Sequence, residues 1–181
     1  MSAQRKLIRN EAAAILSGQI PEIGTRVYTS RKKALFESEL PCIVVFSSGE
    51  PSPKILSDGP REYLRTCNLK FEVATQGTDE DSVEDELDML AHKLEQIFFR
   101  NDTLNSKCTG MTLGEVNIGF SVEGRQITGV CAVNFDATYP VDAPDPTEDN
   151  LPAFTSAGVE IDAGPEPDAV PEIAAEIALA Q

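Results

Sequence analysis

The fold of this chain is decided by residues 61–139, whose three informative pieces are REYLRTCNLKFEVATQG (61–77), DEDSVEDELDMLAHKLEQIFFR (79–100) and GEVNIGFSVEGRQITGVCAVNFDATY (114–139). The first piece alternates apolar and polar residues from Cys67 to Val73, which is typical of an antiparallel or edge strand with one buried face. The third piece contains two alternating runs separated by Glu123-Gly124-Arg125, and this arrangement predicts a β-hairpin.

The middle piece predicts an amphipathic helix. At 100° per residue its apolar side chains stay within an arc of roughly 140°. They are Val83, Leu87, Leu90, Ala91, Leu94, Ile97 and Phe98. We expect Thr78 to cap the helix, with the acidic residues 79–81 favourably placed at the positive end of the helix dipole. The apolar side should then cover the sheet.

The N-terminal part adds a second helix and two strands. Ser2–Ser17 has apolar residues at helical spacing, and Gly18 is placed to end its last turn. Thr25–Thr29 predicts a short strand, and the unbroken apolar run Cys42–Phe46 predicts a strand buried on both faces. Residues 47–60 contain three prolines, two glycines and four serines, so we expect a long loop that cannot continue the sheet.

These elements predict an α+β fold, in which two helices pack on a mixed, mostly antiparallel sheet. We expect the folded domain to comprise residues 1–140. Residues 141–181 carry 10 acidic and no basic side chains, and 7 of the 12 prolines lie from Pro140 onward. This composition predicts an extended acidic arm, within which Pro171–Leu179 could form one short helix of marginal stability.

The net charge of −15 bears on possible partners. Such a charge repels a phosphate backbone, so specific duplex binding is not expected unless the basic cluster Arg31, Lys32 and Lys33 acts locally. The simpler interpretation of that cluster is a solvated loop.

The four cysteines and the apolar runs predict a protein of a reducing cytoplasm. Cys42, Cys67, Cys108 and Cys131 show no CxxC spacing, and three of them lie in apolar strand patterns, so we interpret them as buried thiols. No apolar run approaches the ~20 residues of a membrane span, so no membrane partner is expected.

No motif predicts a catalytic residue or a bound cofactor. Asp85, Asp88 and His92 share the helix side opposite the apolar stripe and could ligate a divalent ion. A single helix supplies only part of a coordination shell, so an acidic solvated face is the preferred interpretation and no metal is predicted. The pairs Gly110/Gly114 and Gly119/Gly124 lack the Lys-Ser/Thr of a P-loop and are interpreted as sheet glycines at bulges or close approaches.

The order of the elements, with a few residues at their joints, supports a resemblance over residues 4–140. The joints are Thr25-Arg26-Val27-Tyr28, Leu40-Pro41, Phe71-Glu72-Val73, Asp85-Glu86-Leu87-Asp88 with Glu95, and Phe135-Asp136-Ala137-Thr138-Tyr139. In this order they resemble the tail terminator proteins of long-tailed bacteriophages, the group that includes minor tail protein U of lambda-like phages.

The resemblance implies a non-enzymatic virion protein of the tail, assembled in the host cytoplasm. It implies a hexameric ring that ends polymerisation of the tail tube protein and joins the tail to the head–tail connector protein, with DNA passing through the channel. From exposure and loop length we expect Arg31, Lys32, Lys33, Glu50 and Lys54 to contribute to interfaces. Asp85 and Asp88 are expected to face the channel, where like charge would keep DNA from sticking.

Two other classes stay open on the sequence. One is a small cytosolic adaptor that binds a peptide at an exposed sheet edge and is a monomer or dimer. The other is a metal-dependent hydrolase using Asp85, Asp88 and His92, which predicts tight binding of a divalent ion.

Overall fold

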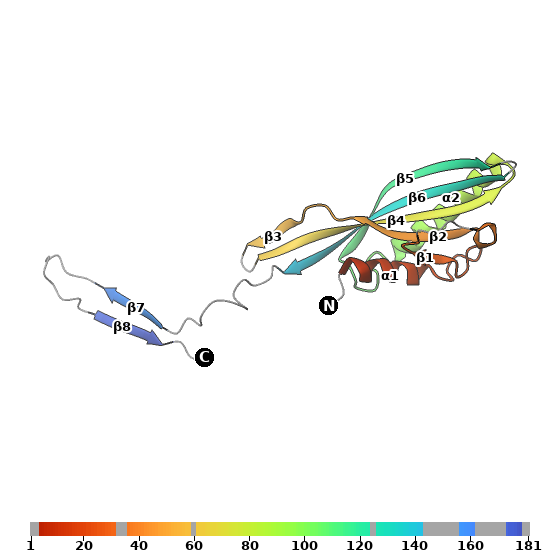
Figure 1. The fold of residues 1–181 in the computed structure, drawn as a ribbon. Coiled ribbons are helices and arrows are strands. Elements are labelled where there is room, and N and C mark those ends of the chain that lie inside the picture. The colour runs from red at the N-terminus through yellow and green to blue at the C-terminus, as the bar shows by residue number, and fades with distance from the viewer. Residues whose placement is uncertain are drawn as a thin grey trace. The chain divides into compact units, whose positions relative to one another are not determined.

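A computed structural model describes residues 4–31, 36–58, 61–123, 126–142, 156–161 and 173–178. The chain divides into two compact units, Met1–Ala143 and Pro144–Gln181 (Figure 1). In the part that the structure describes, no helix combines the length and apolar content needed to cross a membrane.

The first unit contains one six-stranded sheet with the order β1-β2-β4-β6-β5, and β3 pairs with β4 beyond the end of β2. Only the β1–β2 pair is parallel. The strands are β1 (Val27–Thr29), β2 (Cys42–Gly49), β3 (Lys54–Asp58), β4 (Arg61–Gly77), β5 (Gly110–Glu123) and β6 (Gln126–Asp142). Together with the two helices described next, this sheet confirms the predicted α+β class and the predicted hairpin.

Helices α1 (Gln4–Leu16) and α2 (Glu80–Arg100) pack on the same face of the sheet and share one hydrophobic core with it. Helix α1 lies over β1 and β2, whereas α2 lies over β4 and β6. The predicted apolar stripe of α2 is buried except for Ile97, which is partly buried. At the end of α1, Gly18 takes a φ of +78°, as predicted for a residue that ends a helix.

The start of α2 differs from the prediction by one residue. Asp79, not Thr78, is the N-cap, and its carboxylate accepts hydrogen bonds from the backbone N–H of Ser82 at 3.0 Å and from the Ser82 hydroxyl at 2.6 Å. A carboxylate satisfies an unpaired N–H at the positive helix end and also carries the favourable charge, which a threonine cannot supply.

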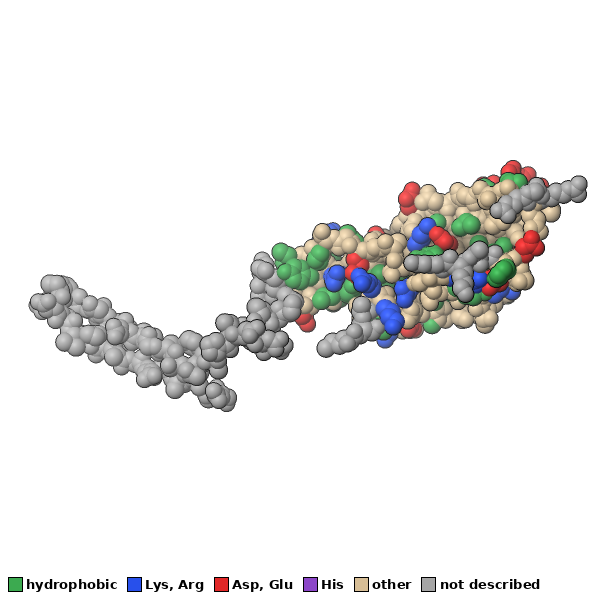
Figure 2. Space-filling view, viewed as in Figure 1, with side chains coloured by type: hydrophobic (Ala, Val, Ile, Leu, Met, Phe, Trp, Pro, Cys, Tyr) green, Lys and Arg blue, Asp and Glu red, His purple; other side chains and the backbone are tan. Residues whose placement is uncertain are grey.

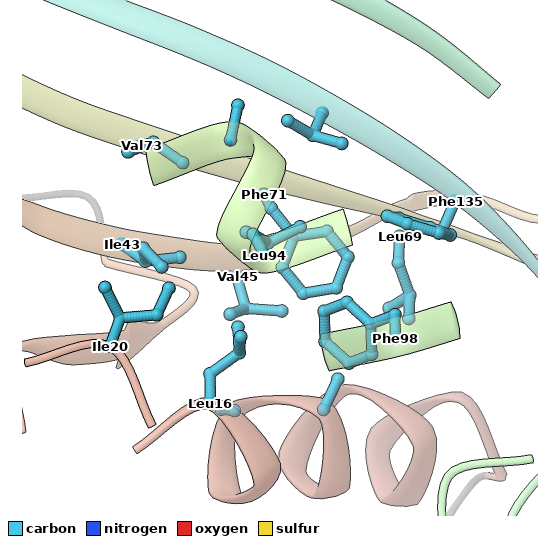
Figure 3. Packing of buried hydrophobic residues seen from close by; sticks show 14 of the residues in the cluster. Leu16, Ile20, Ile43, Val45, Leu69, Phe71, Val73, Leu94, Phe98 and Phe135 are labelled. Carbon is cyan, nitrogen blue, oxygen red and sulfur yellow. The ribbon is translucent and has the colours of Figure 1, made fainter. Parts of the chain in front are cut away.

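Three aromatic rings form the centre of the core (Figure 3). The ring centroid of Phe71 on β4 lies 4.8 Å from that of Phe98 on α2 and 5.9 Å from that of Phe135 on β6. Leu69 is paired directly opposite Phe135 across the sheet, and all four side chains are fully buried. This contact ties the C-terminal end of α2 to the middle of the sheet.

All four cysteines are buried free thiols, as the sequence predicted. Burial raises the pKa of each of them to about 11. Since the thiolate is the reactive form, these side chains act as small apolar core residues at neutral pH.

Two expectations about local structure were wrong. Residues 47–60 are not wholly a loop, because β2 continues to Gly49 and residues 54–58 form β3. The prolines at 51 and 53 lie between these strands, where no ladder hydrogen bond is needed. In the second unit, Ile173–Ala178 is strand β8, antiparallel to β7 (Ser156–Ile161), and not a helix. Pairing supplies hydrogen bonds that an isolated short helix cannot retain in water.

Candidate interaction surface

Four apolar side chains of β5 lie uncovered and form what we call the β5 row. Val116 is 41% exposed, Ile118 37%, Phe120 43% and Val122 61%. They pair directly with Val133, Cys131, Gly129 and Ile127 of β6. Directly opposed residues of neighbouring strands point to the same face of the sheet. The β5 row therefore lies on the face that the helices cover, beyond the edge of the hydrophobic core.

The row is exposed because the sheet is wider than its helix layer. Two helices packed side by side at about 8–10 Å cover a width of about 20 Å, which equals about four strands at 4.8 Å spacing. The described path β1-β2-β4-β6-β5 has five strands, and α2 contacts β5 only slightly. The fifth strand therefore keeps both an apolar face and a free backbone edge.

The side of α2 nearest the β5 row is acidic. Glu84, Asp88 and Glu95 follow one another on this flank at helical spacing. Burial raises the pKa of Cys131 on β6, and the nearby carboxylates of Asp88 and Glu95 raise it further. The opposite flank holds Lys93, whose Nζ lies 2.5 Å from a carboxylate oxygen of Glu22. The β5 row and this acidic flank together make one surface, here called the β5–α2 face.

Phe99 extends the β5–α2 face at the C-terminal end of α2. Its ring centroid lies 6.4 Å from that of Phe135 on β6, yet the side chain is 54% exposed. Phe99 and Met89 lie outside the apolar stripe of α2, and both are exposed, Met89 by 40%. An exposed aromatic residue beside four exposed apolar strand residues is typical of an interaction surface.

Gly129 fixes the distance between α2 and this edge. A Cβ added there would lie 2.6 Å from Cγ1 of Val83, 2.7 Å from Cδ1 of Leu87 and 3.3 Å from Cδ1 of Phe120. At Gly77 an added Cβ would lie 2.8 Å from Cγ2 of Val83. The first turns of α2 can thus approach the sheet only because these two positions lack a side chain.

Glu50 has a different position from the one expected of an exposed loop residue. Its side chain is only 9% exposed and forms ion pairs with Arg65 at 3.0 Å and Arg5 at 3.5 Å. It also accepts a hydrogen bond from the Tyr139 hydroxyl. Burial, followed by the hydrogen bond to Glu50, raises the pKa of Tyr139 to about 12. Glu50 therefore joins α1, β4 and β6, while Lys54 is exposed at the start of β3.

Arg31 is not a solvated cation. Its guanidinium forms two hydrogen bonds of 2.7 Å with the carboxylate of Glu39 and lies 4.7 Å from the ring centroid of Tyr28. The side-chain hydrogen bond with Arg31 lowers the pKa of Glu39. These contacts hold Arg31 near the start of β2. Lys32 and Lys33, the other members of the predicted basic cluster, lie outside the described residues.

Asp85, Asp88 and His92 are exposed on α2, as the helix pattern predicted. Among the described residues, no group of three or more His, Cys, Asp and Glu side chains is arranged to hold a metal ion. The hydrolase alternative therefore gains no support from the geometry. These positions do not test the predicted channel role of Asp85 and Asp88. They also do not test the predicted interface role of the other residues.

Comparisons of the chain with models of known protein families and with curated protein sequences found no match.

The sequence did not indicate the β5–α2 face as a site. An alternating strand has the same pattern whether its apolar side is covered by its own chain or by another molecule. A signal was nevertheless present in Gly114, because a glycine inside a strand pattern often marks a β-bulge, and bulges are over-represented at sheet edges. Gly114 lies within the register shift between Leu113 and Val116, which confirms the interpretation of a bulge there.

Proposed function

We propose that this chain is a structural virion protein that assembles into a ring of identical copies and acts as a tail terminator of a long-tailed bacteriophage. The single observation that carries the assembly part is the uncovered β5 row beside a free strand edge. Four exposed apolar residues on an unpaired edge favour contact with another protein surface. The function at the head-proximal end of the tail tube rests on the resemblance described above.

The fold is consistent with this proposal. The α+β architecture with two helices packed on a mixed sheet is what the resemblance implies for residues 4–140. A ring needs two different patches on each copy, and the outer strands of the sheet, each with one edge that pairs with no described strand, provide candidate surfaces. The proposed partners are five further copies, the tail tube protein and the head–tail connector protein.

The first test is the mass and shape of the purified protein. Light scattering coupled to size exclusion should give the mass of six 19.6 kDa chains, and negative-stain images should show rings with a central channel. Addition of the ring to polymerising tail tube protein should stop tube growth. A monomer at every concentration, together with unchanged tube lengths, would contradict the proposal.

The free edge of β5 also favours a second candidate, an adaptor that binds an extended peptide by strand addition. The two functions differ in oligomeric state. The adaptor should be a monomer or dimer whose β5 amides become protected from hydrogen exchange only when a peptide is added. A terminator should protect these amides on its own assembly.

The proposed channel has its own test. If the exposed carboxylates of Asp85 and Asp88 line it, Asp85→Lys should slow DNA ejection or reduce infectivity, because DNA would adhere to the wall. Asp88 also borders the β5–α2 face, so it is left unchanged and the variant tests the channel alone. Glu37→Lys, which makes the same change at an exposed carboxylate outside α2, is the matched control. Normal ejection by the channel variant in fully assembled particles would count against this role.

The acidic residues 141–181 are proposed to order on a neighbouring copy or on the connector, since extended segments can cover large surfaces on assembly. Deletion of residues 142–181 tests this. Loss of head joining would support an ordering arm, whereas complete rings and normal joining by the truncated protein would leave only a solvated tail.

A further inference from the structure

A second exposed apolar site lies beyond the end of β2, on the edge of β4 that is opposite to β6 and β5. Strand β3 and the paired ends of β4 and β6 project beyond both helices and form what we call the β3 ribbon (Figure 1). Ile55 is 60% exposed and Leu56 is 55% exposed on β3. Hydrophobic side chains gather at this end of the unit, with Lys and Arg side chains nearby (Figure 2). Among the described residues β3 pairs only with β4, so its other edge is free.

The two apolar sites differ in charge, because the β5–α2 face is acidic whereas the described charges of the β3 ribbon balance. Lys54 is exposed on β3, and the partly exposed Arg5 and Arg65 share the single carboxylate of Glu50. Glu62 and Asp142, which pair with each other across β4 and β6, lie at the end of the ribbon, so the described side chains of this region include three cations and three carboxylates. The β5–α2 face holds Glu84, Asp88 and Glu95, and the β5 sequence contains no Lys or Arg.

We propose that a second copy of this chain occupies the β5–α2 face and that it does so with its β3 ribbon. Ile55 and Leu56 of one copy then contact the β5 row of the next, and Lys54 lies toward the acidic flank of α2. This inference rests on the proposed function, because it names the contact by which the copies of the ring join.

Two other occupants fit the charges less well. Pairing of two β5 edges would bring two acidic flanks together, and like charges across an interface weaken association. Residues 144–181 carry acidic but no basic side chains, so they meet the same repulsion. The β3 ribbon offers two adjacent exposed apolar side chains, an exposed Lys54 and no net negative charge among its described side chains. Since it lies on a different surface from β5, the contact is head-to-tail, which closes into a ring if the rotation between copies closes.

Two variants, each with one blocked surface, test the contact. Ile118→Asp with Val122→Asp blocks the β5 row, and Ile55→Asp with Leu56→Asp blocks the β3 ribbon. Each variant alone should be a monomer by light scattering. An equimolar mixture retains one intact contact, so it should form heterodimers and no rings. The wild-type rings should lose mass as the ionic strength rises, because the flanking charges are screened.

The matched control is Asn117→Asp with Ser121→Asp, which adds the same charge to the opposite face of β5 and should leave ring formation intact. Asn117 and Ser121 pair with Ala132 and Thr128, outside the β5 row. Thermal unfolding of every variant checks that it is folded. If a double aspartate variant does not fold, Val122→Ser and Ile55→Ser replace the pair, with weaker but parallel loss of rings.

The outcomes separate the two proposals. A wild type that never assembles overturns both the ring and the contact. A wild type that forms rings, with a mixture that stays monomeric, overturns only the contact. Rings formed by either blocked variant alone also overturn the contact.

Discussion

Replacement of Gly129 by alanine should destabilise the protein because α2 lies directly on this glycine. The added Cβ would meet Val83 at 2.6 Å and Leu87 at 2.7 Å, distances that real Cβ atoms essentially never show. Both neighbours are buried, with 1% and 0% exposure, so they cannot turn into solvent. Overpacking of this kind typically costs about 1–3 kcal/mol, and we expect Gly129→Ala to lie in that range.

Gly119→Ala is the matched control on the neighbouring strand. Gly119 pairs with Val130, and a Cβ added to Gly119 would meet nothing within 4 Å. Loss of chain entropy in the unfolded state should make this variant equally stable or more stable by about 0.4–1 kcal/mol. Urea denaturation monitored by circular dichroism gives the free energy of unfolding for both variants.

A double-mutant cycle separates overpacking from a general weakness of alanine in this strand. Val83→Ala removes the Cγ atoms that lie over Gly129 and Gly77, and alone it should cost about 2 kcal/mol through lost burial and a small cavity. The double variant Val83→Ala/Gly129→Ala should cost less than the sum by at least about 0.5 kcal/mol. Strict additivity, or a Gly129→Ala variant as stable as the wild type, would refute the close approach of α2.

Three further outcomes follow from the described contacts. The four thiols, whose pKa burial raises to about 11, should resist labelling by a disulfide reagent at neutral pH until urea unfolds the chain; rapid labelling of folded protein would contradict their burial. Hydrogen bonds from Ser82 lower the pKa of Asp79 below its ordinary 3.8, so the stability from this cap is present above the unfolded-state pKa and is lost as the pH falls through the folded-state pKa. The melting temperature of Asp79→Ala should therefore be lower than that of the wild type at pH 7 and match it in strong acid. Glu50→Gln should cost about 1 kcal/mol, because two partly exposed arginines lose their carboxylate, and it should lower the pKa of Tyr139 from about 12, measured by ultraviolet titration.

The elements that the sequence predicted well are those with long periodic patterns. The stripe of α2 and the alternation of β4 are sustained over many residues. Such a long periodic pattern identifies both the type of element and the face that it buries. The short strand β3 carries only Lys54–Asp58 between prolines and was not recognised. Its existence depends on pairing with β4 at distant positions, which local propensity does not contain. The prediction placed the N-cap at Thr78, one residue before Asp79, because threonine and aspartate are both favourable N-cap residues.

The candidate site was less predictable than the fold. Glu50 follows a glycine and precedes a proline, which is a pattern of an exposed turn, but its carboxylate is held by Arg5 and Arg65. These partners lie 45 and 15 positions away, and no spacing rule connects them. Gly129 was likewise missed, since its importance comes from Val83 and Leu87 of another element.

The exposed β5 row has a physical consequence for the monomer. A strand whose face is half covered gains part of the hydrophobic free energy available to it, and the rest is released only when another surface covers it. From Val116 to Glu123 every residue of β5 pairs with β6, so the row is held in place before any partner arrives. Because no ordering of that strand is then needed on contact, association is favoured over what a loop of the same composition would give. The width of the sheet, one strand more than two helices cover, is therefore the feature that makes this fold suited to assembly.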